Sequence, residues 1–385
     1  MPTTRLKRIE AKRKYLAILL LILVALVIVG FTFLIIKLIG FYNNIHTPSV
    51  TNGDRDKPKN IYNILLLGYG GGRHQGAYLT DTMMVAHVDL EKKKVVLISI
   101  PRDIWVKVPT KSEPFYSKIN AVYQMGLYPE DYPDLDTRFI TSSENPSGIV
   151  KKVVSDVTGL KIDYYVAVDF QGFVNAIDTL GGIEINVDKS FTDPEYPIEG
   201  KEDDLCGKEE KDLPELEKIA TESAPLAFPC RYETLTFTKG VTHMDGSTAL
   251  KFTRSRHSNQ DGGDFRRAQR QQQVIEAVKN KVLSINFIPK IVPFVDELGD
   301  HITTDIKADR FILEGSNANK YSVATYVISD ELTTQTRSEN GQSILIPQTG
   351  IDKWEEIQTV ISNRLKGITP TPTKLPVTIT PTDIE

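Results

Sequence analysis

Residues 15–36 form a run of 22 residues without a charged side chain, and no other feature of the sequence restricts the fold as strongly. As a helix rising about 1.5 Å per residue, the run would span about 33 Å, enough for a hydrocarbon core of about 30 Å. A core helix of a soluble protein normally shows a polar stripe. A cleavable signal peptide has a shorter apolar region that leads to a small-residue cleavage site, and no Ala-x-Ala pattern follows here. The run therefore predicts an uncleaved transmembrane helix.

The charges beside this run predict its orientation. Residues 1–14 contain six Lys and Arg residues against one Glu, whereas Lys37 is the nearest cation after the run. Because cytoplasmic flanks are rich in Lys and Arg, we expect a cytoplasmic basic tail over residues 1–14 and an extracytoplasmic location for the chain after the anchor. The tail contributes +5 to a net charge of −4, so the remainder carries −9. This charge and location argue against a nucleic-acid partner.

The exported part divides into a stalk, a folded region and a tail. Residues 37–60 end in a polar, proline-containing stretch and predict a stalk, and the Pro- and Thr-rich residues 367–385 predict a disordered tail. Between them, residues 61–366 alternate short apolar runs with amphipathic stretches. This alternation predicts an α/β fold, a layered α/β/α domain with a mixed central sheet. We expect strands over 61–67, 82–90, 94–100, 164–168, 183–187 and 251–256, and helices over 147–158, 170–180 and 264–283.

The two cysteines, Cys206 and Cys230, lie in a charged stretch over residues 197–232 that we interpret as a surface insertion. Outside the membrane, an even pair of cysteines favours a disulfide over a metal site. Zinc would need two more ligands, and the stretch contains no histidine. We therefore expect a structural disulfide that closes the insertion.

A cluster of arginines is the strongest chemical signal, since the stretch RSRHSNQDGGDFRRAQR contains five in 17 positions. Arg254 and Arg256 are two apart on an expected strand and would point to one face. Asp264 would cap the following helix, and Arg267 and Gln271 fall three and seven residues later, on one side of it. Because the planar guanidinium suits bidentate binding of phosphate or carboxylate, the pattern indicates a site for an anionic ligand.

Two other interpretations of the cluster stay open. A solvated, salt-bridged helix face explains most charge runs, and a nucleic-acid patch would need a different location. The arginines outnumber the nearby acids, and Gly262 and Gly263 would permit a ligand to approach the backbone closely. These two observations favour the anion site, and His257 is the only histidine beside it.

Two further charged positions interrupt apolar strands. If the strands on either side of Glu91 pair as a hairpin, Asp81 and Arg102 lie near the same end of the sheet, where α/β sheets hold ligands. Asp81 could instead cap a turn, and Arg102 could pair locally with Asp103. Aspartates without nearby His or Cys, such as Asp81 and Asp264, suit a hard cation such as Mg²⁺.

Other catalytic patterns are missing from the sequence. The glycines at 68–72 match neither the P-loop nor the dinucleotide-binding spacing. No Ser-His-Asp or Cys-His arrangement stands out, and the six histidines form no zinc motif.

Seven motifs, taken in order, resemble the LytR-CpsA-Psr family. They are NILLLG, TDTMMVAHVD, LISIPRD, KINAVY, VDFQGFVNAIDTLGGIEINV, MDGSTALKFTRSRH and DFRRAQRQQQVI. The resemblance covers residues 61–283 clearly and 286–365 weakly. A single anchor followed by an extracytoplasmic domain also agrees with the family.

The resemblance implies a membrane-anchored, Mg²⁺-dependent phosphotransferase, with pyrophosphatase activity as a side reaction. Such an enzyme moves a glycopolymer, for example wall teichoic acid or capsular polysaccharide, from a polyprenyl-pyrophosphate carrier onto peptidoglycan. Asp81 and Asp264 would hold Mg²⁺. The pyrophosphate oxygens would be bound by Arg102, Arg254, Arg256 and Arg267, with Lys118 and Gln271 in the same pocket. Such roles fit phosphoryl transfer, where catalysis is largely positioning and charge neutralisation.

The chain departs from the family pattern at one position. Many members carry an arginine two residues before the first metal aspartate, where this chain has Leu79. Arg73 of the glycine loop could supply that contact instead. The general base is unassigned, and Asp103 is a candidate only by its proximity in sequence.

Two functions of other classes compete with the enzyme. A binding module would use the same pocket to capture polyprenyl-pyrophosphate-linked precursors without turnover. A transcriptional regulator would need access to DNA, which the predicted location does not give.

Overall fold

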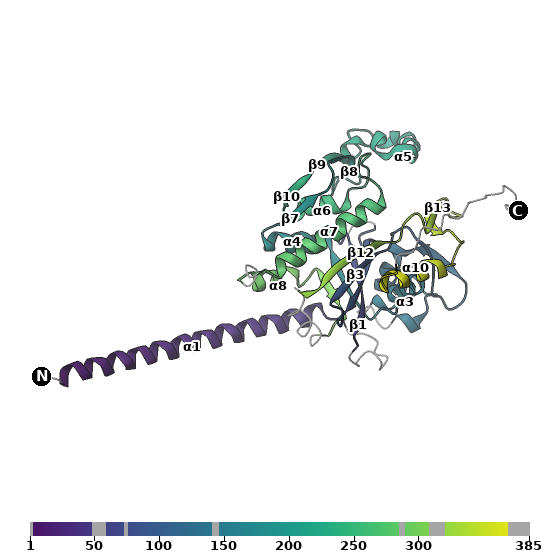
Figure 1. The fold of residues 1–385 in the computed structure, drawn as a ribbon. Coiled ribbons are helices and arrows are strands. Elements are labelled where there is room, and N and C mark those ends of the chain that lie inside the picture. Colours follow the sequence, from purple (N-terminus) through teal and green to yellow (C-terminus); the bar gives the residue numbers. More distant parts are fainter. Residues whose placement is uncertain are drawn as a thin grey trace.

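The computed structural model describes residues 3–47, 59–72, 76–140, 146–284, 289–307 and 320–368, and its centre is a six-stranded sheet of order β11-β6-β1-β2-β3-β12 (Figure 1). The strands are β1 (Ile61–Tyr69), β2 (Thr80–Asp89), β3 (Lys94–Ser99), β6 (Tyr164–Asp169), β11 (Ile302–Thr304) and β12 (Ser322–Val327). β1 pairs with β6, and β3 with β12, in parallel, while the other three pairings are antiparallel. The predicted mixed sheet is confirmed.

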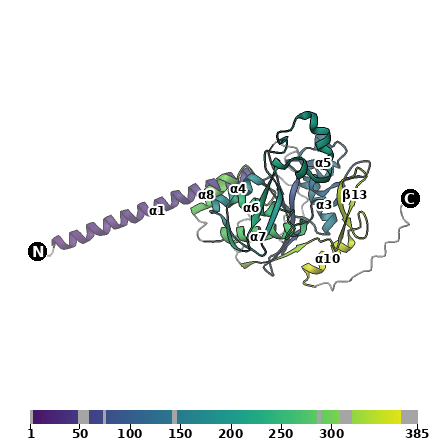
Figure 2. The same cartoon turned by 90° about the horizontal axis from the view of Figure 1, so that it is seen from above.

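Helices cover both faces of this sheet, as the two views in Figures 1 and 2 show. On one side lie α2 (Val122–Leu127), α3 (Ser147–Thr158) and α10 (Glu355–Leu365). Their apolar residues join Leu65, Val85 and Ile98 of the sheet in the main hydrophobic core. On the other side lie α4 (Phe170–Leu180), α6 (Gly246–Arg254) and α7 (Asp264–Val282). Because both faces are covered, β2 is apolar and buried at four consecutive positions, 83–86.

A second, smaller core lies beyond α4, α6 and α7. It is built by two strand pairs, β7 (Ile183–Val187) with β10 (Gly240–Met244), and β8 (Phe191–Pro197) with β9 (Tyr232–Phe237). Phe191, Phe237 and Phe252 stack against one another at its centre. This second core fixes the end of α6, where the arginine cluster begins.

The predicted insertion is an excursion from the end of the β8–β9 ribbon. It contains α5 (Leu213–Ala227), which projects from the domain at the top of Figure 1. Cys206 and Cys230 are joined by a disulfide across 24 residues. Two cysteines in a disulfide are not available as thiolate ligands for a metal.

The remaining elements are short strands and helices. The strands are β4 (Trp105–Val108), β5 (Phe115–Lys118), β13 (Thr333–Arg337) and β14 (Ser343–Pro347). The helices are α8 (Ile291–Leu298) and the 3₁₀ turns Ile119–Ala121, Pro129–Asp131, Thr137–Phe139, Glu210–Asp212 and Pro229–Arg231.

The N-terminal helix α1 (Thr3–Ile45) is one continuous helix of 43 residues. The segment Ile18–Ile45 is long and apolar enough to cross a membrane, and its most apolar stretch is not buried in the protein. The helix does not end at residue 36, because the first part of the predicted stalk, up to Ile45, is helical. Residues 48–58 of the stalk and 369–385 of the tail lie outside the described residues.

Candidate active site

The arginine cluster lines a small pocket of about 90 Å³ between the sheet and the start of α7. The pocket gathers residues from β2, β8, α6 and α7 and from the loops that follow β3 and α6. They are Asp81, Arg102, Asp193, Tyr196, Pro197, Arg254, Arg256, His257, Arg267 and Gln271. Six of the residues selected from the sequence are thus brought together, although up to 190 residues separate them along the chain.

The local structure before Arg256 differs from the expectation. Residues 251–254 are the last turn of α6 and not part of a strand, so the strand predicted over 251–256 is wrong. Asp245 instead caps a helix by accepting a hydrogen bond from Thr248 N at 2.7 Å. Arg254 ends this helix and Arg256 lies in the following loop, and both still line the pocket.

Arg102 is held between two carboxylates at the end of the β2–β3 hairpin. Its Nη1 contacts Asp81 Oδ1, which confirms that the hairpin brings these two residues together. Its Nε lies 3.5 Å from Asp103 Oδ2, and it is buried without a hydrogen-bond acceptor among the described residues. Burial works against the charge, but Asp81 and Asp103 outweigh it and raise the pKa of Arg102. Arg102 therefore keeps its positive charge at the edge of the pocket.

Lys118 and Asp103 form an ion pair behind Arg102 and do not line the pocket. Lys118 Nζ donates to Asp103 Oδ1 at 2.7 Å. Burial would raise the pKa of Asp103, but the hydrogen bond from Lys118 and the charge of Arg102 outweigh it, so this pKa lies below its usual range. A carboxylate with a depressed pKa is a weak proton acceptor. Asp103 therefore suits holding Arg102 better than acting as a general base.

Arg256 and Arg267 are largely buried, and their positive charges lie close to that of Arg102. Burial, followed by the charge of Arg102, lowers the pKa of Arg256. Burial also lowers the pKa of Arg267, whose side chain is only 7% exposed. Arginine stays protonated at neutral pH despite such shifts. In the described part of the chain Arg256 has no ion-pair partner, so the pocket presents excess positive charge to an incoming anion.

Arg254 is positioned by aromatic rings. Its guanidinium lies 4.5 Å from the centre of the Phe170 ring and 5.6 Å from that of Tyr196. Its Nη1 donates to Tyr196 Oη at 3.3 Å. These cation–π contacts hold the side chain without neutralising it. Arg254 can therefore still bind an anionic oxygen.

The loop that carries Arg256 is anchored by Asp193, which the sequence analysis did not identify. Asp193 is 1% exposed, and its Oδ2 accepts hydrogen bonds from Ser255 Oγ, Arg256 N and His257 N at 2.7, 2.9 and 3.1 Å. Burial would raise the pKa of Asp193, but these bonds outweigh it and lower the pKa. The sequence offered no clear signal for Asp193, because β8 also contains Thr192 and Glu195 and was not among the expected strands.

Gly262 also shapes this loop. A Cβ at this position would lie 2.1 Å from the Ser258 carbonyl oxygen and 2.7 Å from that of Arg256. The glycine thus permits the loop to fold back closely on itself. The close approach expected at the two glycines is therefore made at Gly262 by the protein's own backbone.

Asp264 begins α7, but its side chain does not cap the helix, so that expectation is wrong. Gly263, with φ of +87°, occupies the capping position, and Asp264 turns towards Arg267. Asp264 Oδ1 lies 2.9 Å from Arg267 Nη2, yet it is buried without a hydrogen bond among the described residues. A buried carboxylate oxygen with unused acceptor capacity fits a hard cation such as Mg²⁺. Asp81 supplies a second carboxylate nearby, as expected.

Of the remaining positions considered in the sequence, only Gln271 is found in the pocket among the described residues. Gln271 lines the pocket, and its Nε2 lies 3.4 Å from the Thr253 carbonyl oxygen. Leu79 lies in the turn before β2, where its N donates to Gly76 O, and it is not among the lining residues. Arg73 lies outside the described residues.

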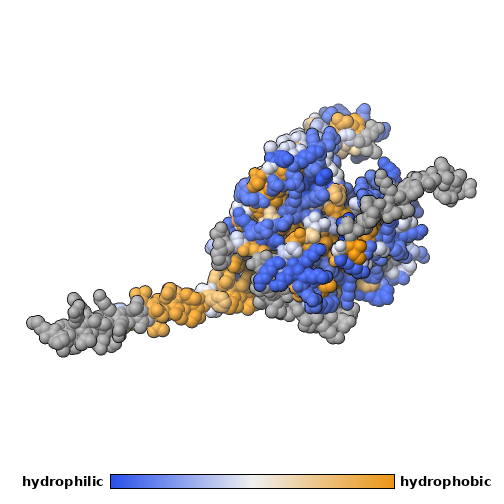
Figure 3. All heavy atoms as spheres, in the orientation of Figure 1, coloured by the Kyte–Doolittle hydropathy of each residue, from blue (hydrophilic) through white to orange (hydrophobic). Residues whose placement is uncertain are grey.

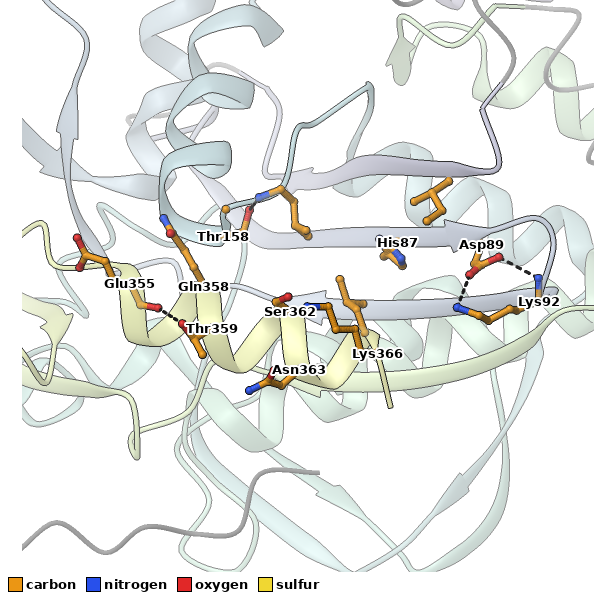
Figure 4. A pocket seen from close by; sticks show the side chains of 14 residues that line it. His87, Asp89, Lys92, Thr158, Glu355, Gln358, Thr359, Ser362, Asn363 and Lys366 are labelled. Atoms are coloured by element: carbon orange, nitrogen blue, oxygen red, sulfur yellow. Dashed lines mark hydrogen bonds and ion pairs between the residues drawn. The ribbon is translucent and has the colours of Figure 1, made fainter. Parts of the chain in front are cut away.

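A larger cavity of about 740 Å³ shares no lining residue with the arginine pocket (Figure 4). It is formed by α10, the end of α3 and the β2–β3 hairpin. In Figure 4 its charged residues are dispersed, and Asp89 is already paired with Lys92 at 3.1 Å. None of the residues selected from the sequence lines it. The smaller pocket is therefore the candidate active site.

Comparison with known proteins identifies a consistent set of relatives. The model of the LytR_cpsA_psr family matches residues 41–359. The polyisoprenyl-teichoic acid–peptidoglycan teichoic acid transferase TagU of Oceanobacillus iheyensis is 26% identical over 348 residues, which cover 83% of this chain and 91% of that protein. TagV of Bacillus subtilis, a transferase of the same name, is 26% identical over 66% of this chain and 51% of its own length. The crystal structure of B. subtilis TagV superposes with a TM-score of 0.53 at 22% identity, covering 82% of this chain and 100% of that one. That structure supports the fold alone.

Proposed function

Because this chain belongs to the LytR_cpsA_psr family, we propose that it transfers a glycopolymer from a polyprenyl-pyrophosphate carrier onto peptidoglycan. The name of TagU describes the transfer of a polyisoprenyl-linked teichoic acid to peptidoglycan by that relative. The observation that carries the proposal to this chain is the arginine pocket. Four buried or half-buried arginines from three separate segments converge on a space that suits phosphate groups.

The proposed step exchanges one phosphorus–oxygen bond for another. An acceptor hydroxyl of peptidoglycan attacks the phosphorus atom that bears the glycan. The bond from this phosphorus to the bridging oxygen of the pyrophosphate breaks, polyprenyl phosphate leaves with the bonding electrons, and the hydroxyl proton passes to a base or to water. Water in place of the acceptor would give the pyrophosphatase side reaction.

The arginines of the pocket would bind and neutralise the phosphate oxygens during this step. Arg102 and Arg256 both line the pocket, Arg256 has no ion-pair partner among the described residues, and Arg267 is held in place by Asp264. Preorganised charge of this kind stabilises the transition state because it needs no rearrangement as the reaction proceeds. The glycan does not fit in about 90 Å³ and would extend from the pocket along the surface.

We further propose Mg²⁺ as the cofactor, held by Asp264 and Asp81. When bound, the ion would supply additional positive charge to the pyrophosphate oxygens. In the structure Asp81 contacts Arg102 and Asp264 contacts Arg267, so each candidate ligand lies beside an arginine that would bind the phosphate oxygens.

The cytoplasmic orientation of the N-terminus is part of the proposal. It rests on the six cations of residues 1–14 and the apolar segment of α1 that follows. The folded domain would then face the extracytoplasmic side, where peptidoglycan is found. A disulfide such as Cys206–Cys230 is also usual in that environment.

The proposal is tested with the purified full chain, a synthetic polyprenyl-pyrophosphate oligosaccharide and peptidoglycan, with and without Mg²⁺. We expect oligosaccharide attached to peptidoglycan and release of polyprenyl phosphate, both lost in Arg256→Ala and retained in Arg337→Ala, an exposed arginine of β13. Tight binding of the lipid without turnover would instead establish the binding module. Full activity of Arg256→Ala would overturn the assignment of the pocket.

Magnesium binding is tested separately from turnover. We expect Mg²⁺ to raise the thermal unfolding temperature of the wild type in the presence of pyrophosphate, and this shift to disappear in Asp264→Asn. Asp203→Asn, a change at an exposed carboxylate of the insertion, should keep the shift. An unchanged shift in Asp264→Asn would remove Asp264 from the metal site.

A further inference from the structure

The helix α8 lies beside the membrane helix at the height where α1 leaves the bilayer. Lys37 Nζ of α1 donates to Asp296 of α8 at 2.9 Å. Asn44, seven residues later on α1, donates to Gly299 O at 2.8 Å and to Asp300 Oδ1 at 3.1 Å. Since both helices advance in the same direction between these contacts, α8 runs parallel to α1. The N-terminal end of α8 therefore points back along α1, towards the segment 15–36.

The distance that α8 reaches back can be worked from helix geometry. Lys37 is the first charged residue after the apolar run, so it marks the outer edge of the hydrocarbon core. Ile291 precedes Asp296 by five residues, which corresponds to about 7 Å at 1.5 Å per residue. The first turn of α8 thus lies up to about 7 Å closer to the bilayer centre than the Lys37–Asp296 contact. In both Figures 1 and 2, α8 is the part of the domain that reaches furthest back along α1.

Along α8, the change from apolar to charged residues lies beside the corresponding change in α1. Its first four residues, 291–294, are apolar, and its only charges are Asp296 and Glu297 near the other end. Pro293 is exposed and Ile291 and Val292 are half-buried, whereas Val295 and Leu298 are buried in the domain. In Figure 3 the hydrophobic surface of α1 runs up to the base of the domain. Lys290 does not oppose this pattern, because its Nζ donates to Leu180 O at 2.7 Å.

We propose that the first turn of α8 inserts into the outer leaflet at the boundary between headgroups and acyl chains, so that the domain rests on the bilayer at two points. With a single transmembrane helix, the domain could rotate about the axis of that helix. A second apolar contact, locked to α1 through Lys37 and Asp296, fixes the height and rotation of the domain. The first turn of α8 would enter this boundary end-on to about 7 Å, a depth similar to the about 5–10 Å to which helices lying in the interface bury their apolar face.

The inference rests on the proposed membrane anchoring, and the test separates the two. The full chain is reconstituted in vesicles of phosphatidylcholine and phosphatidylglycerol that contain acyl-brominated lipid, which quenches nearby tryptophan. The two native tryptophans are replaced by Phe, and one tryptophan is introduced at a time. The probes are Pro293→Trp and, as a second position, Ile291→Trp. Phe33→Trp in α1 reports on the anchor, and Leu226→Trp, 77% exposed on α5, reports on the aqueous domain.

We expect the fluorescence of Pro293→Trp and Ile291→Trp to be quenched at least about half as strongly as that of Phe33→Trp, because the boundary lies within reach of the bromines. Leu226→Trp should show no quenching. Quenching of Phe33→Trp alone would overturn the insertion of α8 while leaving the anchor intact. No quenching of Phe33→Trp would contradict the anchor itself. Circular dichroism of each variant establishes that it is folded before it is scored.

Discussion

The replacement of Asp193 is the sharpest test of how the pocket is built, because Asp193 supports the arginines without being one of them. Its Oδ2 accepts three hydrogen bonds from the loop that carries Arg256, and its Oδ1 accepts a fourth from Glu195 N at 3.0 Å. In Asp193→Ala all four donors lose their acceptor in a site where the side chain is 1% exposed. The loop must then rearrange or bury unpaired donors.

The size of the effect follows from these bonds. A hydrogen bond to a charged group contributes about 1.5–3 kcal/mol, but bonds that share one acceptor do not add fully. We expect Asp193→Ala to lower the free energy of unfolding by about 3–5 kcal/mol, as for other broken buried charge networks. Asp193→Asn can keep its one oxygen on the three loop donors and should lose about 1–3 kcal/mol. A shift of about 1 Å in Arg256 would cost on the order of 100-fold in kcat/KM.

The assay compares urea unfolding with glycan transfer in both variants, and Asp203→Asn serves as an exposed control on the neighbouring insertion. We expect Asp193→Asn to remain folded at 25 °C, to bind pyrophosphate more weakly and to transfer more slowly, and the control to match the wild type. Wild-type pyrophosphate affinity and transfer in Asp193→Asn would refute the reasoning, since the loop would then hold Arg256 without this carboxylate.

Three other predictions follow from the same structure. Arg256→Lys should recover only part of the roughly 100-fold loss in kcat/KM expected for Arg256→Ala, because an ammonium cannot bind phosphate in bidentate fashion; equal activity of Arg256→Lys and the wild type in the transfer assay would contradict this. Replacing both cysteines by Ser should lower the free energy of unfolding by about 3 kcal/mol, as expected for a loop closed across 24 residues, and urea unfolding measures it. The stability difference between the wild type and Asp193→Asn should stay constant at neutral pH and shrink below about pH 4. The sign follows because the folded pKa of Asp193 is lowered, so its contribution is present above the unfolded pKa and lost as pH falls through the folded one.

Most of the fold could be predicted from the sequence because its elements have clear local patterns. The helices at 147–158 and 170–180 were predicted with their observed bounds, since each combines apolar residues at helical spacing with a glycine after its end. The prediction failed at 251–256, where a strand was expected and the last turn of α6 is found. There the decisive signal was the cap at Asp245, six residues earlier, together with burial of Ala249 and Phe252 in the second core.

The continuation of α1 could not be predicted from hydropathy alone. Lys37 ends the apolar run, and a charged residue is an ordinary place for a membrane helix to stop. The helix continues to Ile45, where Lys37 contacts α8 and Asn44 contacts Gly299 just after it, 255 or more residues away in the sequence. Such distant contacts leave no local trace.

The structure brings six of the selected residues together in spite of the wrong strand, and the reason is physical. Arginine and aspartate bind the same kinds of ligand whether a helix, a strand or a loop carries them. The contact between Asp81 and Arg102 depends only on the pairing of the two hairpin strands. What the sequence could not supply is the support behind the cluster. Asp193 acts through backbone N–H groups that every residue possesses, so no side-chain pattern reveals its partners. Residues that touch a ligand are thus identifiable by their chemistry, whereas residues that hold them in place become visible only in the folded structure.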